Sequence, residues 1–425
     1  MTNEKKLFLK NFIWNILGTG LNSFNSLFFL VIVTRINGIN DAGIFSIAYS
    51  TALILYTIGL YSGRLCQVTD IENKIKDKDY IVNRLITCII MIILAIGFVF
   101  IRQYSSYKMW IFILLCVYKA TEAFGEIFYG IMQKHDLLYR SGQSLTIKSL
   151  LGLIFFLIVD YGTKNIILAC IVIIMLNISM LVLFDYGLIC RKLIDLKIKI
   201  NMNNVWNIFK SEFFVFANSF AGIYVLNAPK YAIDNYLTED IQAIFGYIMM
   251  PATVITLFTQ FIFMPYLNKL KELYEQKNMR EFKNIALKIK LAVLGFGIFA
   301  SIAAFVIGPE ILTIIYGENL IMYRMNLTII LASYIMYGIS YVNLVLLTTT
   351  RNTFVQFIVY IITMIVAFVG SNVLVQKFQI NGATFSCTIT LGVQFILYTI
   401  LTKIILDKIG KNKGEIKNGK EFFGF

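Results

Sequence analysis

The sequence predicts an all-α integral membrane protein with twelve transmembrane helices. Of its 425 residues 58% are hydrophobic and 15% are charged, and the mean hydropathy is +0.74. This leaves too little polar surface for a soluble protein of several domains. Apolar stretches recur from end to end, each long enough to cross about 30 Å of hydrocarbon as a helix. They are apolar on all sides, whereas the strands of a membrane barrel alternate apolar and polar residues.

The first six spans occupy the N-terminal half. The first span follows a basic start, MTNEKKLFLKNF, without a small-residue cleavage site, so we expect it to be retained and not removed as a signal. The next two are uninterrupted apolar runs. The fourth contains charged residues and is treated separately below. The expected spans are 12–34, 43–62, 85–103, 109–130, 143–160 and 166–189.

The other six spans follow a basic amphipathic connector at 190–210. The seventh is interrupted by Pro229 and Lys230. Between the eighth and the ninth, residues 265–290 combine apolar residues at helical spacing with many lysines, which is typical of an interfacial helix or of a solvated connector. The expected spans are 212–235, 243–264, 291–315, 325–347, 354–376 and 382–405.

Twelve spans divide naturally after the sixth into two six-helix lobes. We expect an N-terminal lobe at 1–195 and a C-terminal lobe at 196–425, the second ending in a basic tail. The segments that open the second and eighth spans, DAGIFSIAYS and QAIFGYIMMPA, are weakly similar. Such a repeat predicts lobes related by pseudo-two-fold symmetry, and transporters with this organisation bind substrate near the membrane midplane.

The positions of Lys and Arg predict the orientation. Of 38 such residues, 30 fall in the inner connections and termini and 6 in the outer connections when both termini are cytoplasmic. Arg84 and Lys148 are assigned to the inner group, and Lys119 and Lys230 remain inside spans. The net charge of +14 is therefore a signal of topology and of attraction to anionic lipid, not of nucleic-acid binding.

Catalysis and metal binding are not expected. The six cysteines form no CxxC pair, and His135 is the only histidine, so the sequence predicts buried thiols and no metal site. No H-x-x-x-x-D pattern and no nucleophile elbow occur. The outer loops are also short, which argues against a polymer ligase or polymerase.

The fourth span carries Lys119, Glu122 and Glu126 on one helical face, because they are three and four residues apart. Ionisable groups inside a span cost at least about 2.5–3.5 kcal/mol each, so they normally face a bundle interior or a water-filled cavity. Lys119 and Glu122 either neutralise each other or serve a site. Glu126 would then be protonated, paired across the bundle or exposed to cavity water.

The seventh span places Lys230 after a proline that removes a backbone donor, so we expect the helix to bend or open at Pro229. An ion pair with Asp234 and snorkelling to the outer surface are the alternatives for Lys230. Arg35 and Arg64 are either interfacial anchors or part of a cationic cavity. A cavity with basic residues suits an anion, because phosphate oxygens accept charge-assisted hydrogen bonds from Arg and Lys.

Four segments resemble the polysaccharide repeat-unit flippases, which are the O-antigen and capsule exporters of the multidrug/oligosaccharidyl-lipid/polysaccharide (MOP) superfamily. They are VIVTRINGINDAGIFSIAYS (31–50), EIFYGIMQKHDLLYRSG (126–142), NAPKYAIDNYLTEDIQAIFGYIMMPA (227–252) and IIYGENL (314–320). The resemblance extends over essentially the whole chain. It implies a MATE-like fold that moves oligosaccharides, linked through pyrophosphate to a polyprenyl lipid, from the inner to the outer leaflet of the cytoplasmic membrane by alternating access.

The resemblance also implies roles for individual residues. The family's basic residue after the proline corresponds to Lys230, its acidic residue before "YG" to Glu126, and its basic residue at the end of span one to Arg35. Lysine replaces the frequent arginine at 230, which removes the bidentate fork. The expected substrate-binding residues are Arg35, Arg64, Lys119 and Lys230, the expected ion-coupling or cavity carboxylates are Glu122, Glu126 and Asp234, and the expected hinge is Pro229.

No cofactor is expected, and transport would be coupled to H⁺, to Na⁺ or to the membrane potential. Membrane lipids and polysaccharide assembly proteins are the further expected partners. The alternative functions are a lipid II or teichoic-acid precursor flippase, a cation-coupled multidrug antiporter of the same superfamily, a membrane-bound polymerase or ligase, and a non-transporting assembly partner.

Overall fold

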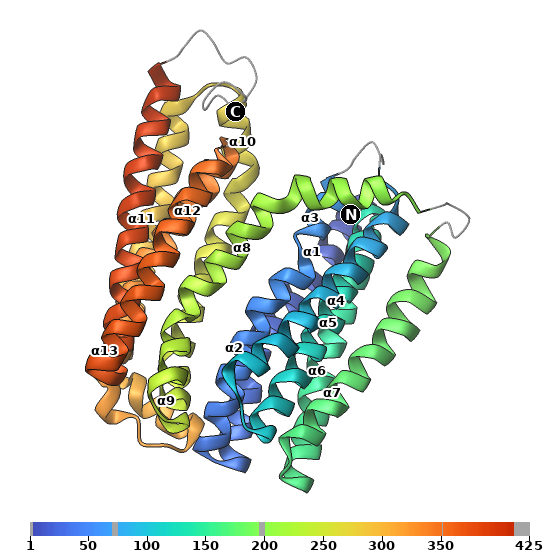
Figure 1. The fold of residues 1–425 in the computed structure, drawn as a ribbon. Coiled ribbons are helices and arrows are strands. Elements are labelled where there is room, and N and C mark those ends of the chain that lie inside the picture. Colours follow the sequence, from blue (N-terminus) through green and yellow to red (C-terminus); the bar gives the residue numbers. More distant parts are fainter. Residues whose placement is uncertain (1–2, 70–74, 195–199, 351, 412–425) are drawn as a thin grey trace. The chain divides into compact units, whose positions relative to one another are not determined.

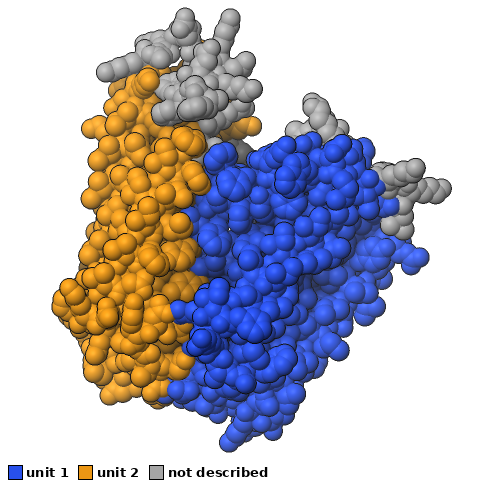
Figure 2. Space-filling view, viewed as in Figure 1, with its two compact units in different colours: residues 1–223 blue, residues 224–425 orange. Residues whose placement is uncertain are grey.

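The computed structural model describes residues 3–69, 75–194, 200–350 and 352–411, and the secondary structure of these residues is helical throughout (Figure 1). The chain forms two compact units, Met1–Ile223 and Tyr224–Phe425 (Figure 2). The division lies inside one long helix, α8 (Met202–Tyr236). The boundary expected at residues 195 and 196, like the expected basic tail after residue 411, lies outside the described part of the chain.

The first unit is built around one central helix, α5, which packs against α2, α4 and α7, while α1 packs along α6 (Figure 1). Its helices are α1 (Asn3–Asn37), α2 (Ile39–Leu60), α3 (Gly63–Thr69), α4 (Asp77–Arg102), α5 (Ser106–Lys134), α6 (Leu138–Thr163) and α7 (Ile166–Met180), followed by the π-helix η1 (Leu181–Ile189) and the 3₁₀ turn η2 (Cys190–Lys192). Buried aromatic rings join α1 to α2 and α6, with the centroid of Phe29 6.4 Å from that of Phe45 and 4.7 Å from that of Phe156.

The second unit is built around α12, which packs against α9, α11 and α13. Its elements are α9 (Glu239–Phe263), η3 (Met264–Tyr266), α10 (Leu267–Glu275), α11 (Met279–Tyr316), η4 (Ile321–Tyr323), α12 (Arg324–Thr349) and α13 (Thr353–Lys411). Uncharged hydrogen bonds join α12 to α13: Asn326 Nδ2 donates to Asn381 Oδ1 at 2.8 Å, and the hydroxyls of Ser333 and Thr388 are 2.8 Å apart.

The segment 265–290 forms η3 in part, α10 and the first turns of α11. Leu270 and Leu273 of α10 are buried in a cluster with Phe282 and Ile289 of α11. The apolar face of α10 is therefore covered by its own unit. The expected position of the segment at the inner leaflet, as an interfacial helix or as a solvated connector, stays a prediction.

Each of the twelve expected spans lies within helical segments of the structure to within two residues, but α1, α4, α8 and α11 begin well before the expected spans 12–34, 85–103, 212–235 and 291–315. Within the described chain, nine helices are long and apolar enough to cross a membrane, and one of these, Phe354–Ile409, is long enough to cross twice. The expected spans in α5 and α8 are not among the nine, and α5 carries three charged residues in its apolar part. The expected all-α, multi-pass membrane fold is confirmed.

A sharp bend separates the last two spans. Gln379 has φ 51° and ψ −131°, and the helical chain before and after it forms the two halves of α13. The halves approach closely, because a Cβ on Gly382 would lie 1.9 Å from the carbonyl oxygen of Leu374. The side chain at 379 therefore sits in a backbone region that favours glycine.

We expect Gln379→Gly to raise the thermal stability of the purified protein by the equivalent of about 1 kcal/mol, because glycine removes the steric cost of positive φ. Gln376 is exposed and helical on the same element, and Gln376→Gly is the matched control. It should lower stability by about 0.5–1 kcal/mol, since glycine weakens a helix interior. Loss of stability in both variants to the same degree would show that residue 379 is not strained.

Candidate functional site

The central helix α5 carries its first ion pair near the middle of the unit. Lys119 Nζ lies 2.6 Å from Glu122 Oε2, and only 5% of the Lys119 side chain is exposed. The ammonium group also lies over three tyrosine rings, with centroid distances of 4.8 Å to Tyr49, 5.6 Å to Tyr56 and 5.1 Å to Tyr118. Cation–π contacts of this kind strengthen when the cation is removed from water. Lys119 and Glu122 thus neutralise each other in this conformation.

One turn further along α5, Glu126 pairs across the bundle. Arg64 of α3 approaches Glu126 with Nη1 and Oε2 2.7 Å apart, and its Nη2 donates to Gln133 Oε1 at 3.1 Å. The side chains of Arg64 and Glu126 remain 27% and 19% exposed. Of the three states expected for Glu126, the structure shows the cross-bundle pair. Arg64 therefore reaches into the bundle, and its guanidinium is still accessible.

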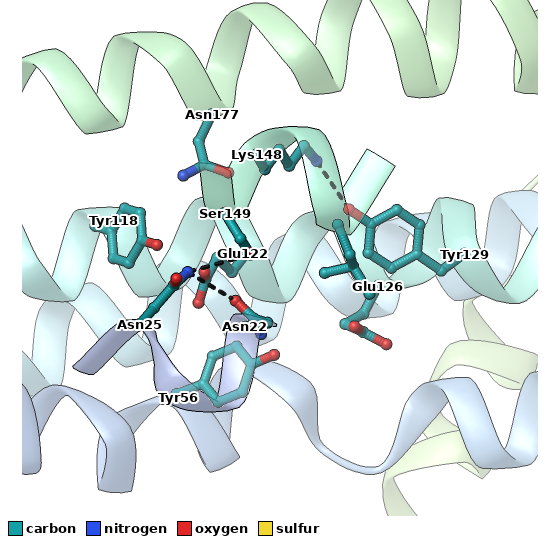
Figure 3. A pocket seen from close by; sticks show the side chains of 11 residues that line it. Asn22, Asn25, Tyr56, Tyr118, Glu122, Glu126, Tyr129, Lys148, Ser149 and Asn177 are labelled. Carbon is teal, nitrogen blue, oxygen red and sulfur yellow. Dashed lines mark hydrogen bonds between the residues drawn. The ribbon is translucent and has the colours of Figure 1, made fainter. Parts of the chain in front are cut away.

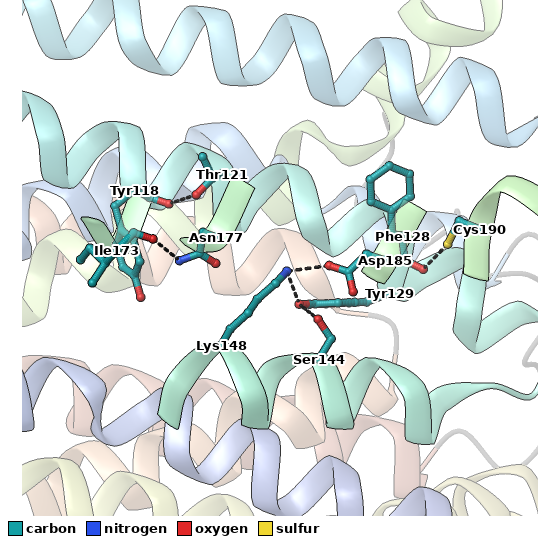
Figure 4. A network of polar contacts seen from close by, with 10 residues as sticks. All are labelled: Tyr118, Thr121, Phe128, Tyr129, Ser144, Lys148, Ile173, Asn177, Asp185 and Cys190. Carbon is teal, nitrogen blue, oxygen red and sulfur yellow. Dashed lines mark hydrogen bonds and ion pairs between the residues drawn. The ribbon is translucent and has the colours of Figure 1, made fainter. Parts of the chain in front are cut away.

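A third pair was not predicted from the sequence. Lys148 Nζ donates to Asp185 Oδ2 at 2.6 Å and to Tyr129 Oη at 3.0 Å, and the hydroxyls of Tyr129 and Ser144 lie 3.2 Å apart (Figure 4). The side chains of Lys148 and Asp185 are 7% and 0% exposed. The assignment of Lys148 to the inner connection was wrong, because the residue lies within α6 and faces η1.

The carboxylate of this pair is carried by a π-helix. Asp185 lies within the nine residues of η1, which continues α7. Stretches of π-helix are rare, most are single turns, and they are frequent at functional sites. The signal for the pair was present in the sequence, since Lys148 and Asp185 lie in the expected fifth and sixth spans. Spacing along a single helix could not show that they meet.

Arg84 was also assigned to the inner connections, and the structure buries it completely, with 1% of the residue exposed. Its Nη1 donates to the carbonyl oxygen of Gly59 at 2.7 Å, and Thr87 Oγ1 donates to the same oxygen at 2.7 Å. These donors satisfy a carbonyl in the last turn of α2, where the helix itself supplies no partner. Arg84 therefore has a structural role. When it is left out of the count, the expected inner connections still hold many more basic residues than the outer ones.

A polar pocket inside the first unit is lined by three of these charged side chains, Glu122, Glu126 and Lys148, whereas Arg64, Lys119 and Asp185 are not among its lining residues (Figure 3). It is lined by Asn22, Asn25, Tyr56, Tyr118, Glu122, Glu126, Tyr129, Leu145, Lys148, Ser149 and Asn177. Asn25 Nδ2 donates to Ser149 Oγ at 3.2 Å and thereby joins α1 to α6. The volume open to the centre of a water molecule is about 10 Å³, which is the space that one water needs. In this conformation the pocket fits a water or a small cation but no phosphorylated sugar.

The remaining expected site residues lie elsewhere. Arg35 is exposed in the last turn of α1. Lys230 and Asp234 are partly buried and one turn apart on the part of α8 that belongs to the second unit. Pro229 is buried, and the helix continues through it without interruption. The expected opening at the proline is therefore absent from this conformation, and its role as a hinge stays a prediction.

Metal ligands do not gather in the part of the chain that the structure describes, where no group of three His, Cys, Asp or Glu side chains could hold an ion. Five of the six cysteines are described, and all five are buried with free thiols.

Comparison with known proteins gives one relative in sequence and several in structure. No family model matches the chain. The chain is 25% identical over 412 residues to the capsular polysaccharide biosynthesis protein CapF of Staphylococcus aureus. This alignment covers 93% of the chain and 100% of CapF. An inward-facing multidrug resistance MATE family transporter of the MOP superfamily superimposes with a TM-score of 0.73 at 10% identity, covering 94% of this chain and 100% of the transporter.

The lipid II flippase MurJ in an inward closed conformation superimposes with a TM-score of 0.70 at 15% identity, covering 96% of this chain and 90% of the flippase. These two structures, a transporter and a flippase, show the fold of the chain. The chain has the MATE-like fold of the MOP superfamily, the superfamily that its sequence resembles.

Proposed function

We propose that this protein is a flippase that moves polyprenyl-pyrophosphate-linked oligosaccharide repeat units from the inner to the outer leaflet of the cytoplasmic membrane by alternating access. The observation that carries the proposal is the full-length similarity to a capsular polysaccharide biosynthesis protein, on a fold shared with a lipid II flippase. The basic residues on the expected inner connections support an orientation with both termini in the cytoplasm. The lipid-linked oligosaccharide, membrane lipids and polysaccharide assembly proteins are the partners that this function implies.

The ion pairs of the first unit support a mechanism in which a transported anion replaces a carboxylate as the partner of a basic side chain. Arg64, Lys119 and Lys148 each have a carboxylate partner, so a phosphate that binds one of these three cations must displace a carboxylate. Arg64 is the most accessible of the three cations, at 27%, and its guanidinium offers a bidentate fork that matches phosphate oxygens. We propose that the substrate pyrophosphate replaces Glu126 on Arg64.

The displaced carboxylate supplies a route for energy coupling. Glu126, released from Arg64 into a pocket with room for one small ion, would take up H⁺ or Na⁺, and Glu122 lies one turn away. An inside-negative membrane potential acts in the same direction. It favours outward movement of two phosphate charges by roughly 4.6 kcal/mol per 100 mV.

We expect Arg64→Ala to lower polysaccharide export about 10- to 100-fold at equal protein level, because a hydrogen bond to a charged group contributes about 1.5–3 kcal/mol. Arg64→Lys should retain part of the activity, since the charge remains without the fork. Arg140 is exposed and bonds to Gln143 on its own helix, so Arg140→Ala is the control and should export normally. The measurement is surface polymer per cell in a complemented deletion strain. Normal export by the Arg64→Ala variant would show that Arg64 does not bind the substrate.

The deletion strain also tests the function itself. Loss of the gene should cause lipid-linked oligosaccharide to accumulate on the inner side while surface polymer falls, and the wild-type gene should reverse both changes. Accumulation of lipid II would instead assign the protein to peptidoglycan precursors. Sensitivity to organic cations with normal polymer would assign it to multidrug antiport.

The coupling proposal is tested in sealed vesicles that contain the substrate. Transport should accelerate with an imposed H⁺ or Na⁺ gradient, and Glu126→Gln should remove that response. If neither gradient changes the wild-type rate, Glu122 and Glu126 do not couple ions, and the membrane potential remains as the driving force.

A further inference from the structure

Arg64, the residue proposed to bind the pyrophosphate, follows directly after a break between two helices. The helix α2 ends at Leu60, and α3 begins at Gly63. The two residues between them both have a left-handed backbone, Tyr61 with φ 39° and Ser62 with φ 55°. Residues with a side chain rarely adopt this region, and they persist in it only where the surrounding structure holds them. The direction of α3, and with it the place of Arg64, therefore depends on the contacts that hold the break.

One side of the break is held by Arg84. Its buried guanidinium donates through Nη1 to the carbonyl oxygen of Gly59 at 2.7 Å, and a Cβ at Gly63 would lie 3.0 Å from its Nη2. Arg84 thus contacts both the last turn of α2 and the first residue of α3. In its turn α3 packs against α5, where the buried side chain of Gln67 lies on Gly130. These contacts set α3 against the helix that carries the pocket carboxylates.

The other side of the break is held by α8. Tyr61 Oη donates to the carbonyl oxygen of Phe209 at 3.1 Å. The ring of Tyr61 stacks on that of Phe216, with centroids 4.6 Å apart and planes 18° apart, and meets the ring of Phe209 edge-on at 5.0 Å. Aromatic pairs in these geometries are favourable beyond the area that they bury. Tyr61 is therefore a contact through which α8 holds the left-handed break in place.

The helix α8 is fixed to the first unit near its start and leaves that unit further along. Ile208, which is 0% exposed, belongs to a buried cluster of the first unit, and the helix continues past Ile223 into the second unit. Phe209 and Phe216 lie between these two points. A bend or shift of α8 during alternating access would therefore act directly on Tyr61.

We propose that Tyr61 is a positioning residue for Arg64, through which α8 controls whether Arg64 is placed to exchange Glu126 for a pyrophosphate. The hydrogen bond and the aromatic contacts hold the break, the break directs α3, and α3 presents Arg64. When the contacts with α8 are lost, the break relaxes and the fraction of molecules with a correctly placed Arg64 falls. The apparent affinity for the substrate falls by the same fraction. This inference rests on the proposed role of Arg64 in binding the substrate.

The test is a double-mutant cycle on export, measured as surface polymer per cell in the complemented deletion strain at equal protein level. Tyr61→Leu should lower export about tenfold, and Tyr61→Phe, which keeps the aromatic contacts and loses the hydrogen bond, about threefold. In the Arg64→Ala background neither substitution should lower export further by more than about twofold, because Tyr61 acts through Arg64. A titration of the expression level of Arg64→Ala verifies that its residual export lies above the detection limit.

The matched control is Tyr107 of the same unit. It is 37% exposed, and its hydroxyl donates to Asp41 Oδ2 at 3.1 Å, so Tyr107→Phe also removes one tyrosine hydrogen bond. Tyr107→Phe should export normally in both backgrounds. A monodisperse elution profile verifies that each purified variant folds, and Tyr61→Phe decides the question if Tyr61→Leu does not.

The outcomes separate this inference from the proposed function. Normal export by both Tyr61 variants, with Arg64→Ala impaired, would overturn the inference and leave the proposed function intact. Equal losses on replacing Tyr61 with and without Arg64 would show that Tyr61 acts independently of Arg64, which would also overturn the inference. Normal export by Arg64→Ala would overturn the proposed binding role of Arg64 and this inference with it.

Discussion

Replacing Asp185 by Leu is expected to lower the free energy of unfolding by about 3–5 kcal/mol, because Lys148 would remain buried without its partner. Both side chains are almost inaccessible, at 7% for Lys148 and 0% for Asp185. Bulk water therefore does not surround the Lys148 ammonium group, and the pocket beside it has room for about one water molecule. The measurement is the unfolding transition of the purified protein in mixed detergent, followed by circular dichroism.

A double variant separates the ion pair from simple packing. Lys148→Met combined with Asp185→Leu removes both charges, and buried pairs replaced by apolar residues of similar volume are often neutral or stabilising. We expect the double variant to recover most of the loss. The exposed pair Lys271–Glu275, with 71% and 64% of the two side chains exposed, is the control. Glu275→Leu should cost at most about 1 kcal/mol. If the double variant is as unstable as Asp185→Leu alone, the uncompensated lysine is not the cause.

The second large effect is expected at the contact between α1 and α6. A Cβ at Gly142 would lie 2.4 Å from the carbonyl oxygen of Trp14 and 2.8 Å from the backbone nitrogen of Asn15, and a Cβ at Gly18 would lie 2.6 Å from the carbonyl oxygen of Gly142. These neighbours are backbone atoms, which cannot rotate away. Small residues let membrane helices approach closely where no hydrophobic force joins them.

We therefore expect Gly142→Ala to push α1 away from α6 and to cost about 3 kcal/mol, the upper end of the usual range for overpacking. Gly152 lies on the same helix with no atom within 4 Å of its added Cβ. Gly152→Ala should gain about 0.5–1 kcal/mol, because alanine favours the helix. Thermal unfolding in detergent measures both. A Gly142→Ala protein as stable as the wild type would mean that the two helices are not in close contact.

The spans could be predicted because each is a property of one local segment. The long apolar runs, the interruption at Pro229 and the charges of α5 are visible in the sequence itself. The two halves of α13 were separated at the correct place, since polar residues near Gln379 interrupt the apolar pattern. A membrane helix makes its backbone hydrogen bonds within its own segment. Once a membrane is assumed, a long apolar run therefore has few alternatives to a helix.

The partners inside the bundle could not be predicted in the same way. Spacing showed that Lys119 and Glu122 could meet, since they share a helix face. Glu126 meets Arg64 from α3, and Lys148 meets Asp185 from a π-helix, and neither contact follows from a periodicity. Orientation counting treated Lys148 as a loop residue, because a charge near the end of a span is ambiguous from sequence alone.

The most direct measurement of the central claim uses the purified protein in liposomes that hold a fluorescent polyprenyl-pyrophosphate oligosaccharide. The fraction of substrate that a membrane-impermeant quencher reaches is followed with time. The account predicts that the wild type equilibrates the substrate between leaflets at least about tenfold faster than Arg64→Ala, while Arg140→Ala matches the wild type. Wild-type liposomes that equilibrate the substrate no faster than protein-free liposomes would contradict it.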